Sequence, residues 1–276
     1  MVMAFNKILV PVDFTSNTDA AVSHALALSD NSHTEIHLLH VLTKETKKVS
    51  YPISRFYTMT AVTFGSLEKL TIKNLEDLKG KIQNALPTIK IIVHLVLEGN
   101  VQGNIIQKAQ ELQTDLIIIG KKRDHSWLSF LNTTSSSFIA AVTNCAVLQV
   151  SGEVEARKIG AVVLPVRRKM CERKINLLQT LTYRQRPTIH LITVVNDEDN
   201  GPCSDDFINT FRTLSECLHY PMNVKVIQRN NSSKDIFKYA VDINAGLIMI
   251  DPFDQVTGKY NFIKSACNML FVASTK

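Results

Sequence analysis

The chain contains the same four apolar runs twice, in the same order. Each run of the first half returns in the second: ILVPVD (8–13) as VVLPVR (162–167), IHLLHV (36–41) as IHLITV (189–194), IIIG (117–120) as IMID (248–251), and CAVL (145–148) as CNML (267–270). A duplicated fold explains matches in this order. The offset between the copies falls from 154 to 153, 131 and 122 residues, so the second copy has lost residues. We therefore expect two domains of one fold, the second of them reduced.

The composition is that of an ordinary globular protein. Of the 276 residues, 45% are apolar and 20% are charged, and the length suits two domains that each bury a core. No apolar run approaches the roughly 18–20 residues that span a bilayer, and the first residues lack a signal-peptide pattern. We therefore expect a cytoplasmic protein that does not bind membranes.

Charge and cysteine content argue against two further classes. The net charge of +6 forms no basic stripe interleaved with aromatic residues, so we expect no nucleic-acid partner. The five cysteines form no CxxC pair, which argues against a disulfide framework and against a zinc site. We expect all five thiols to be reduced. Cys145 and Cys267 precede matching strands and should be buried.

Short β-branched runs alternate with helical stretches in both halves, which predicts α/β domains with parallel sheets. We expect first-half strands at 7–12, 35–41, 89–97, 115–119 and 146–150, with helices at 17–29, 64–85, 101–113 and 134–143. We expect second-half strands at 160–166, 188–195, 223–228, 246–250 and 269–273. Ser16, with Asp19 three residues later, is the expected start of the first helix. Residues 43–63 are interpreted as a solvated loop and 151–156 as a polar linker.

These residues resemble a known family, the universal stress proteins, in their tandem form. The resemblance rests on the strand ends at 10–13 and 39–41, Gly99, the run 115–120 and the closing run 144–148. It covers almost all of residues 5–150 and, in degraded form, 158–273. It implies a five-stranded, Rossmann-like parallel sheet in the order 3-2-1-4-5 with helices on both faces. The first domain would span 1–152 and a degenerate second domain 157–276.

The resemblance also implies that the last strands of the two domains pair across a pseudo-two-fold axis. Elementary physics agrees, because residues 147–150 and 269–272 would otherwise be exposed apolar edges. We therefore expect an intramolecular pseudo-dimer, while a further homodimer stays open.

A ligand site is expected in the first half, where the strand order reverses. Open α/β sheets bind ligands at the carboxyl ends of the strands on either side of that point, here strands one and four. The resemblance implies an adenine nucleotide, ATP or AMP, held through its adenosine by Pro11, Val12 and Asp13, with Val41 beside the base. Asp13 has a second interpretation, in which its carboxylate hydrogen-bonds the turn after the strand.

The phosphate motif of the family is only partly present. It requires glycine at positions 120, 123 and 133, followed by a hydroxyl residue, whereas the chain has Gly120, Arg123, Thr133 and Thr134. Because glycines let backbone amides approach phosphate closely, the usual cradle is lost. A helix start can still attract an anion, and cationic side chains can replace amides. The residues expected to face phosphate are Gly120, Lys121, Arg123, Thr133, Thr134 and Ser135. The alternative is a solvated basic turn before a hydroxyl-rich helix cap.

The second half should bind no nucleotide in this manner. Arg167 stands in the place of Asp13, and Asp251 stands in the place of Gly120. From this last position to the closing cysteine there are 25 residues in the first half but only 16 in the second, so nine residues of phosphate loop are missing. A carboxylate at this position repels phosphate.

No catalytic constellation is evident in the sequence. It contains no GxxxxGK(S/T), GxGxxG or HExxH motif. His37 and His40 are three residues apart on a strand, which places them on opposite faces, so they cannot share a metal ion. The other histidines are expected to be surface or packing residues. A weak ATPase has no candidate base or metal ligand.

Two functions from different classes remain. The first is a non-enzymatic, cytoplasmic universal stress protein, a stress-response or regulatory factor with at most one adenine-nucleotide site, in the first half. The second is a nucleotide-free module that binds a protein or another small ligand. Both leave the protein partner unknown.

Overall fold

The computed structural model describes residues 5–29, 33–42, 64–121, 133–152, 159–166, 169–195, 205–228, 232–253 and 267–273. The loop expected at 43–63, most of the expected linker, Arg123 and Arg167 lie outside these residues. No helix of the described part is long and apolar enough to cross a bilayer.

The first half alternates strands and helices. Its elements are β1 (Lys7–Pro11), α1 (Ser16–Leu28), β2 (Glu35–Val41), α2 (Phe64–Ala85), β3 (Lys90–Val96), α3 (Val101–Leu112), β4 (Leu116–Gly120), α4 (Thr133–Thr143) and β5 (Ala146–Val150). All pairings within this half are parallel. β4 consists of a leucine, three isoleucines and a glycine and is buried throughout, as a central parallel strand must be.

The second half repeats this order as far as β9, with shorter helices. Its elements are β6 (Ala161–Pro165), α5 (Glu172–Thr182), β7 (Thr188–Val195), α6 (Asp205–Leu218), β8 (Met222–Gln228), α7 (Ser232–Asp242), β9 (Leu247–Ile250) and β10 (Asn268–Phe271). Pairing within this half is again parallel. The predicted order 3-2-1-4-5 is therefore confirmed in both halves.

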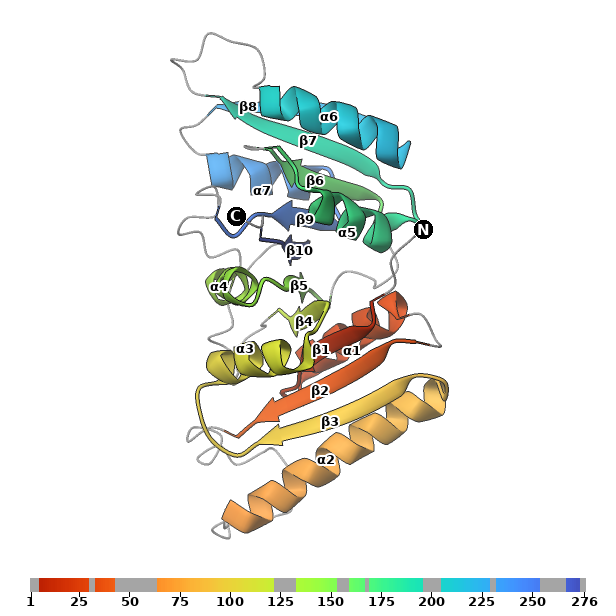
Figure 1. Cartoon of the computed structure of the whole chain (residues 1–276), viewed down its shortest axis with the longest axis vertical. Helices are drawn as coiled ribbons and strands as arrows, with labels where there is room; N and C mark the ends of the chain where they lie inside the picture. The colour runs from red at the N-terminus through yellow and green to blue at the C-terminus, as the bar shows by residue number, and fades with distance from the viewer. Residues whose placement is uncertain are drawn as a thin grey trace.

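The two halves join in one ten-stranded sheet through their last strands. The strand order is β3-β2-β1-β4-β5-β10-β9-β6-β7-β8, and the strands follow one another along the longest axis of the molecule (Figure 1). β5 and β10 are antiparallel, with facing pairs Gln149–Met269, Leu148–Leu270 and Val147–Phe271. This seam buries both apolar edges, and it confirms the predicted pseudo-dimer.

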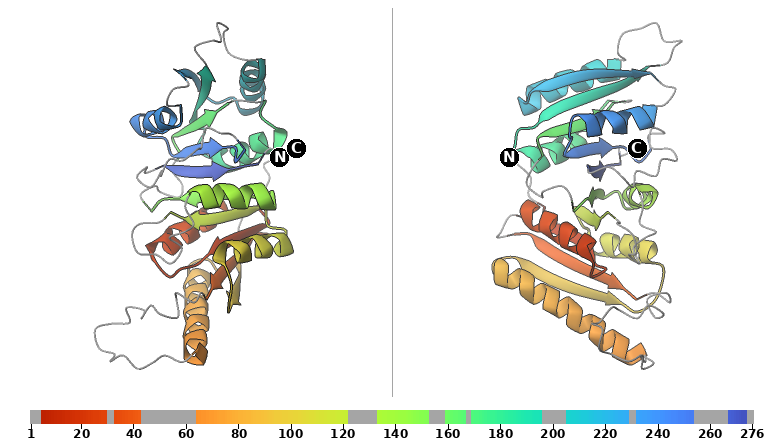
Figure 2. Two further views of the ribbon diagram at one scale, coloured as in Figure 1. Left: turned by 90° about the vertical axis from the view of Figure 1, so that its left-hand side faces the viewer. Right: turned by 180° about the vertical axis from the view of Figure 1, so that it is seen from behind.

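Helices cover both faces of the sheet (Figure 2). Residues of α1, α2, α5 and α6 contribute to the apolar core on one face, and residues of α3, α4 and α7 contribute to the core on the other. Strands supply both cores because successive side chains point to opposite faces. In β2, for example, Ile36 and Leu38 face the first core, and Leu39 and Val41 face the second.

The predicted first-half helices and all ten strands are confirmed, with ends within two residues of those expected, and α1 begins at Ser16 as predicted. Thr15, not Ser16, caps the helix, because its side chain accepts a hydrogen bond from Asn17 N at 3.2 Å. Asp13 fixes Thr15 in this position, since the Asp13 carboxylate accepts hydrogen bonds from both the backbone and the hydroxyl of Thr15. Ser16 is then the first residue of the helix.

Candidate functional site

The carboxyl ends of β1 and β4 meet where the strand order reverses. β1 lies between β2 and β4, so Pro11 and Gly120 end neighbouring strands at one edge of the sheet (Figure 1). Val12 follows β1, and its backbone N–H donates to Leu39 O at 2.8 Å. Val41 ends β2 and is buried. The residues that the sequence assigns to adenosine therefore share this edge, and their role in binding stays a prediction.

The Asp13 carboxylate is engaged by the turn after β1. Its Oδ1 accepts hydrogen bonds from Thr15 N at 3.0 Å, Thr15 Oγ1 at 2.6 Å and Thr18 Oγ1 at 2.7 Å. In return, Asp13 N donates to Thr18 Oγ1 at 2.9 Å. The side chain is buried. These bonds support the second interpretation of Asp13, as the residue that orders the entry to α1.

Gly120 lies directly against the backbone of α1. A Cβ at this position would be 2.1 Å from Asn17 O and 2.6 Å from Asn17 C, far inside any allowed contact. Asn17 belongs to the first turn of α1. The close approach of helix to strand therefore requires glycine at this position, whether or not phosphate binds nearby.

Three polar side chains, Lys121, Ser136 and Gln149, lie at the carboxyl edge of β4 and β5, and we call them the carboxyl-edge cluster. Lys121 follows β4 and is 9% exposed, and its backbone N–H donates to Val150 O at 2.6 Å. Gln149 lies beside that residue in β5. A short turn joins α4 to β5, so the helix runs back over the strand. Its first turn, with Ser136, returns to the carboxyl end of β5.

Two atoms of the carboxyl-edge cluster are buried without a described partner. Ser136 Oγ and Gln149 Oε1 have no hydrogen-bond partner within the described ranges, although Ser136 is 0% and Gln149 2% exposed. A buried polar group without a partner costs about 1–3 kcal/mol. Native structures usually satisfy such groups with a ligand or an ordered water molecule. A residue outside the described ranges, an ordered water molecule or a ligand would have to satisfy these two atoms.

The other residues expected to face phosphate are only partly described. Thr133 and Thr134 open α4, and Ser135 follows in its first turn, half-buried. The side chains of Thr133 and Thr134, and all of Arg123, lie outside the described residues. Their roles stay predictions.

Cys145 and Cys267 are buried, as expected. Burial raises the pKa of each thiol to about 12, and the positive charge of Lys121 partly opposes the rise at Cys267. Lys121 therefore lies near the start of β10 as well. Cys171 and Cys217 are also free thiols, and Cys203 lies outside the described residues.

In the second half, an ion pair occupies the place of Gly120. Asp251 follows β9, and its Oδ2 lies 2.5 Å from Lys174 Nζ, with both side chains about nine-tenths buried. Its Oδ1 accepts a hydrogen bond from Phe253 N at 3.0 Å. Lys174 stands in the first turn of α5, as Asn17 does in α1. The chain thus neutralises the carboxylate with its own lysine.

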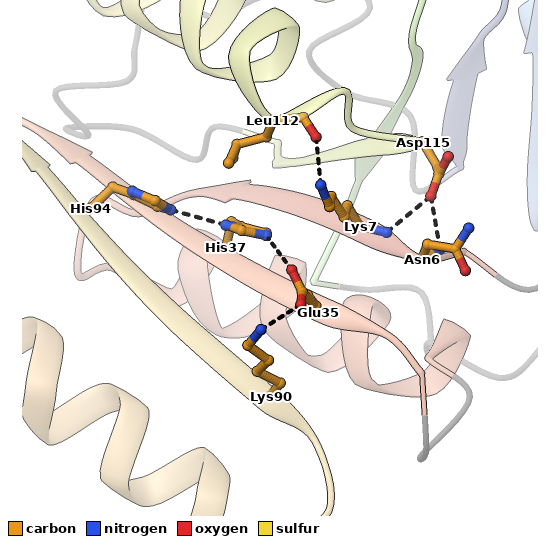
Figure 3. Close-up of polar contacts among 8 residues, drawn as sticks. All are labelled: Asn6, Lys7, Glu35, His37, Lys90, His94, Leu112 and Asp115. Carbon is orange, nitrogen blue, oxygen red and sulfur yellow. Dashed lines mark hydrogen bonds and ion pairs between the residues drawn. The ribbon is translucent and has the colours of Figure 1, made fainter.

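A row of polar side chains crosses β2 and β3 on the face covered by α3 (Figure 3). His37 Nδ1 and His94 Nε2 are 2.9 Å apart. Glu35 Oε2 lies 3.4 Å from His37 Nε2, an ion-pair distance without hydrogen-bond geometry, and Lys90 Nζ lies 2.5 Å from Glu35 Oε1. The two imidazole planes differ by 16° and their centroids are 5.2 Å apart, so the rings meet edge to edge. We call these four residues the histidine row.

The charges around the histidine row favour one arrangement of its protons. The Glu35 carboxylate favours the His37 proton on Nε2, so His37 Nδ1 accepts from His94 Nε2–H. Two ring nitrogens aimed at each other along one line leave no place for a metal ion between them. Burial lowers the pKa of His37, and burial with the charges of His37 and Lys108 lowers that of His94 to about 4. Across the described ranges, no group of three or more ligand side chains could hold a metal ion.

His40 lies on the opposite face of β2 from His37, as predicted. Its Nδ1 is 2.8 Å from Val12 O, and its ring centroid is 4.9 Å from that of Phe14. Since Val12 O can only accept, His40 carries its proton on Nδ1. Burial lowers the pKa of His40 to about 4, so the ring is neutral at neutral pH.

The second half has a counterpart of the histidine row. His190 stands in the place of His37, and its Nδ1 lies 2.8 Å from Tyr239 Oη. By strand register, Lys225 stands in the place of His94, and its ammonium lies 5.8 Å from the centre of the Tyr239 ring. The same place therefore holds a second histidine in one half and a lysine in the other.

Sequence reasoning missed Gln149, Lys174 and the pairing of His37 with His94, and it included Ser136 only within the hydroxyl-rich helix start at 133–137. Gln149 offered a signal, as the polar residue of an otherwise apolar buried strand. Lys174 offered none, because α5 carries several polar residues and their sequence does not show which one meets Asp251.

Comparison with known proteins agrees with this fold. A family model described as the universal stress protein family matches residues 4–151, more than half of the chain. A universal stress protein from Archaeoglobus fulgidus is similar in structure, with a TM-score of 0.63 and 15% identity over 97% of this chain and 96% of that chain. A functionally unknown protein from Pseudomonas aeruginosa PAO1 has a TM-score of 0.63 and 13% identity over 98% of this chain and 93% of that chain. No significant match was found among curated proteins.

Both structural relatives span the two halves of the chain. At these identities they bear on the fold alone, and they agree with the ten-stranded arrangement. With its repeated 3-2-1-4-5 sheet and the match over its first half, the chain belongs to the universal stress protein family, in the tandem two-domain form.

Proposed function

We propose that the protein is a non-enzymatic, cytoplasmic stress-response or regulatory factor that binds one adenine nucleotide, ATP or AMP, in its first half. The observation that carries the proposal is the carboxyl-edge cluster. Ser136 and Gln149 hold buried polar atoms that no described residue satisfies, beside the nearly buried Lys121. They lie at the strand ends where open α/β sheets bind ligands.

An anion suits this cluster better than a neutral ligand. The first turn of α4 presents backbone N–H groups without helical partners, and the helix dipole favours negative charge there. Lys121 adds a positive charge, and the Ser136 hydroxyl can donate a hydrogen bond. In this proposal the phosphates lie at α4, and the adenosine extends toward Val12, Asp13 and Val41 at the ends of β1 and β2.

The stoichiometry of one nucleotide per chain follows from the second half. There Asp251 and Lys174 form an ion pair at the place of Gly120, so a phosphate would have to displace a buried carboxylate from its lysine. Such a displacement leaves an unpaired buried charge, which is strongly unfavourable.

A nucleotide-free interaction module is the second candidate, and two observations favour it. Asp13 Oδ1 already receives three donors from the turn. The backbone of Asn17 lies against Gly120. Both residues therefore have structural explanations that need no nucleotide, and ordered water would then satisfy Ser136 and Gln149.

Titration calorimetry with ATP and AMP distinguishes the two candidates. We expect one site per chain, with affinity that falls as salt is added, because side-chain cations replace part of the glycine cradle. Ser136→Ala should weaken binding about tenfold through loss of a hydrogen bond to a charged group. Ser137→Ala is the matched control, since Ser137 is the next residue of the same helix and only half-buried. Gly120→Val is unsuitable because its side chain would collide with Asn17.

Three results would decide against the proposal. No binding at millimolar ATP to folded protein would favour the nucleotide-free module. Two equal sites would contradict the role of the Asp251–Lys174 ion pair. Turnover of bound ATP that survives further purification would contradict the non-enzymatic assignment.

A further inference from the structure

A buried polar network links the first half to the second at the seam between β5 and β10. His24 on α1 donates from Nδ1 to Ala20 O at 2.9 Å, so its Nε2 is an acceptor, and Asn268 Nδ2 lies 3.1 Å from it. Asn268 Oδ1 accepts from Ser151 N at 2.9 Å. His24 is 4% and Asn268 2% exposed. Backbone groups fix the His24 tautomer and the orientation of the Asn268 amide. Asn268 Nδ2 is therefore the donor and His24 Nε2 the acceptor.

The two halves carry different residues at the positions related by the pseudo-two-fold axis. The seam is centred on a leucine of β5 that faces its own counterpart in β10, so Asn268 corresponds to Ala146. Five of the six buried positions of α1 return as buried positions of α5 157 residues later: 17, 18, 21, 24 and 25 become 174, 175, 178, 181 and 182. His24 therefore corresponds to Leu181.

The seam thus combines one polar pair with one apolar pair. His24 and Asn268 hydrogen-bond each other, whereas their counterparts Leu181 and Ala146 both belong to the apolar core on the same face. Two identical halves cannot reproduce this combination. Each would place a polar residue against an apolar one, and the two-fold symmetry would repeat that mismatch at both positions.

We infer that this asymmetry is a pairing code, by which the first half accepts a second half and rejects another first half. Two first halves joined through β5 would place His24 against Ala146 twice and leave each buried Nε2 without its donor. Two second halves joined through β10 would place Asn268 against Leu181 twice and leave each amide without its acceptor. Leaving a buried polar atom unsatisfied is costly, so the mismatches act against the wrong partner.

On the opposite face of the seam, the residues of the two halves also match only when a first half meets a second half. Gln149 faces Met269, and the fully buried Phe271 faces Val147. Two first halves would bury two glutamines at the seam instead of one. Two second halves would bring two phenylalanines against two methionines and overpack it. Both faces therefore match only when unlike halves meet.

A set of full-length variants tests the code through stability and assembly together. His24→Leu and Asn268→Ala, made singly, should each raise the unfolding equilibrium constant about tenfold, because each leaves its partner unsatisfied. The double variant copies the apolar pair Leu181–Ala146 and should recover most of this loss. After unfolding and refolding at high concentration, light scattering should show more dimer in the double variant than in the wild type. Adding Gln149→Leu should increase the dimer fraction further.

The control separates specificity from stability. Thr71→Val removes a buried hydrogen bond within α2, from Thr71 Oγ1 to Leu67 O, and leaves the seam intact, so it should lower stability without raising the dimer fraction. Single variants as stable as the double variant would refute the network. Dimer fractions at the wild-type level in the double and triple variants would refute the code. If only the triple variant dimerises, the discrimination resides in Gln149, and the inference about His24 and Asn268 is wrong.

Discussion

The ends of β4 and β9 are corresponding positions of the two halves, but they carry different residues. At the end of β4, Gly120 lets the backbone of α1 lie against the strand, and two buried polar atoms of the carboxyl-edge cluster have no hydrogen-bond partner among the described residues. At the end of β9, Asp251 and Lys174 satisfy each other. A duplicated domain can therefore keep its fold while a glycine is replaced by a buried carboxylate, provided that a lysine of the neighbouring helix pairs with it.

The largest effect should come from breaking the ion pair of the second half. Lys174→Met removes the positive charge that pairs with a buried carboxylate and should destabilise the protein by about 3–5 kcal/mol. Denaturant unfolding monitored by circular dichroism measures the loss. Lys79→Met is the control, because Lys79 and Glu76 form a partly exposed pair worth about 0–1 kcal/mol. Asp251→Leu combined with Lys174→Met should recover much of the stability, and equal effects of Lys174→Met and Lys79→Met would show that the pair is not a closure of the site.

In the first half, one methyl group added at Gly120 should destabilise the protein. Gly120→Ala places a Cβ against Asn17 O and should cost about 1–3 kcal/mol through overpacking. Gly80→Ala is the matched control, since no atom lies within 4 Å of the added Cβ, and it should stabilise α2 by about 0.5–1 kcal/mol. The midpoints of thermal unfolding compare the two. A Gly120→Ala protein as stable as wild type would mean that α1 yields easily, and that the glycine is present for another reason.

The fold was predictable because its determinants are local, whereas the contents of the site were not. The run 116–119 predicts a buried strand by composition alone, and the repeat predicts the second sheet. Lys174 meets Asp251 across 77 residues, and the sequence of α5 does not show which of its polar residues faces the end of β9. His94 meets His37 only once the register of β2 and β3 is known.

The histidine row should make the first half sensitive to acid. The pKa of His94 is lowered to about 4 in the folded protein, from an ordinary value of 6.5. The unfolded chain therefore binds the proton first, and stability should fall as the pH drops from about 6.5 toward 4. Urea midpoints between pH 7.5 and 4.5 measure the slope. His94→Gln should reduce it, with the remainder arising from the other buried histidines.

The second half supplies the control for this pH dependence. Lys225 stands in the place of His94 and supplies no imidazole there, so Lys225→Gln should leave the slope unchanged. A slope that is the same in wild type and His94→Gln would show that His94 does not titrate in this range.

The smallest expected effect is a difference in stability between substitutions on β3 and on β8, the two outer strands of the sheet. Val93 on β3 packs against the core beneath the 22-residue α2, whereas Val224, its register counterpart on β8 beside the 14-residue α6, is 49% exposed. Val93→Thr should cost about 1 kcal/mol by burying a hydroxyl, and Val224→Thr less than about 0.5 kcal/mol. Equal costs in chemical denaturation would mean that α6 covers its edge as well as α2 does.

The antiparallel seam has a consequence for the protein during its synthesis. β5 is complete at Val150, but the strand that covers it ends at Phe271. At about 5–20 residues per second, ribosomes need roughly ten seconds to make the intervening stretch. During that time the first half exposes an apolar strand edge that β10 does not yet cover. Exposed strand edges of this kind can pair with other chains and cause aggregation. The delay between the synthesis of β5 and that of β10 should therefore determine how strongly folding depends on chaperones and how often it ends in misassembly.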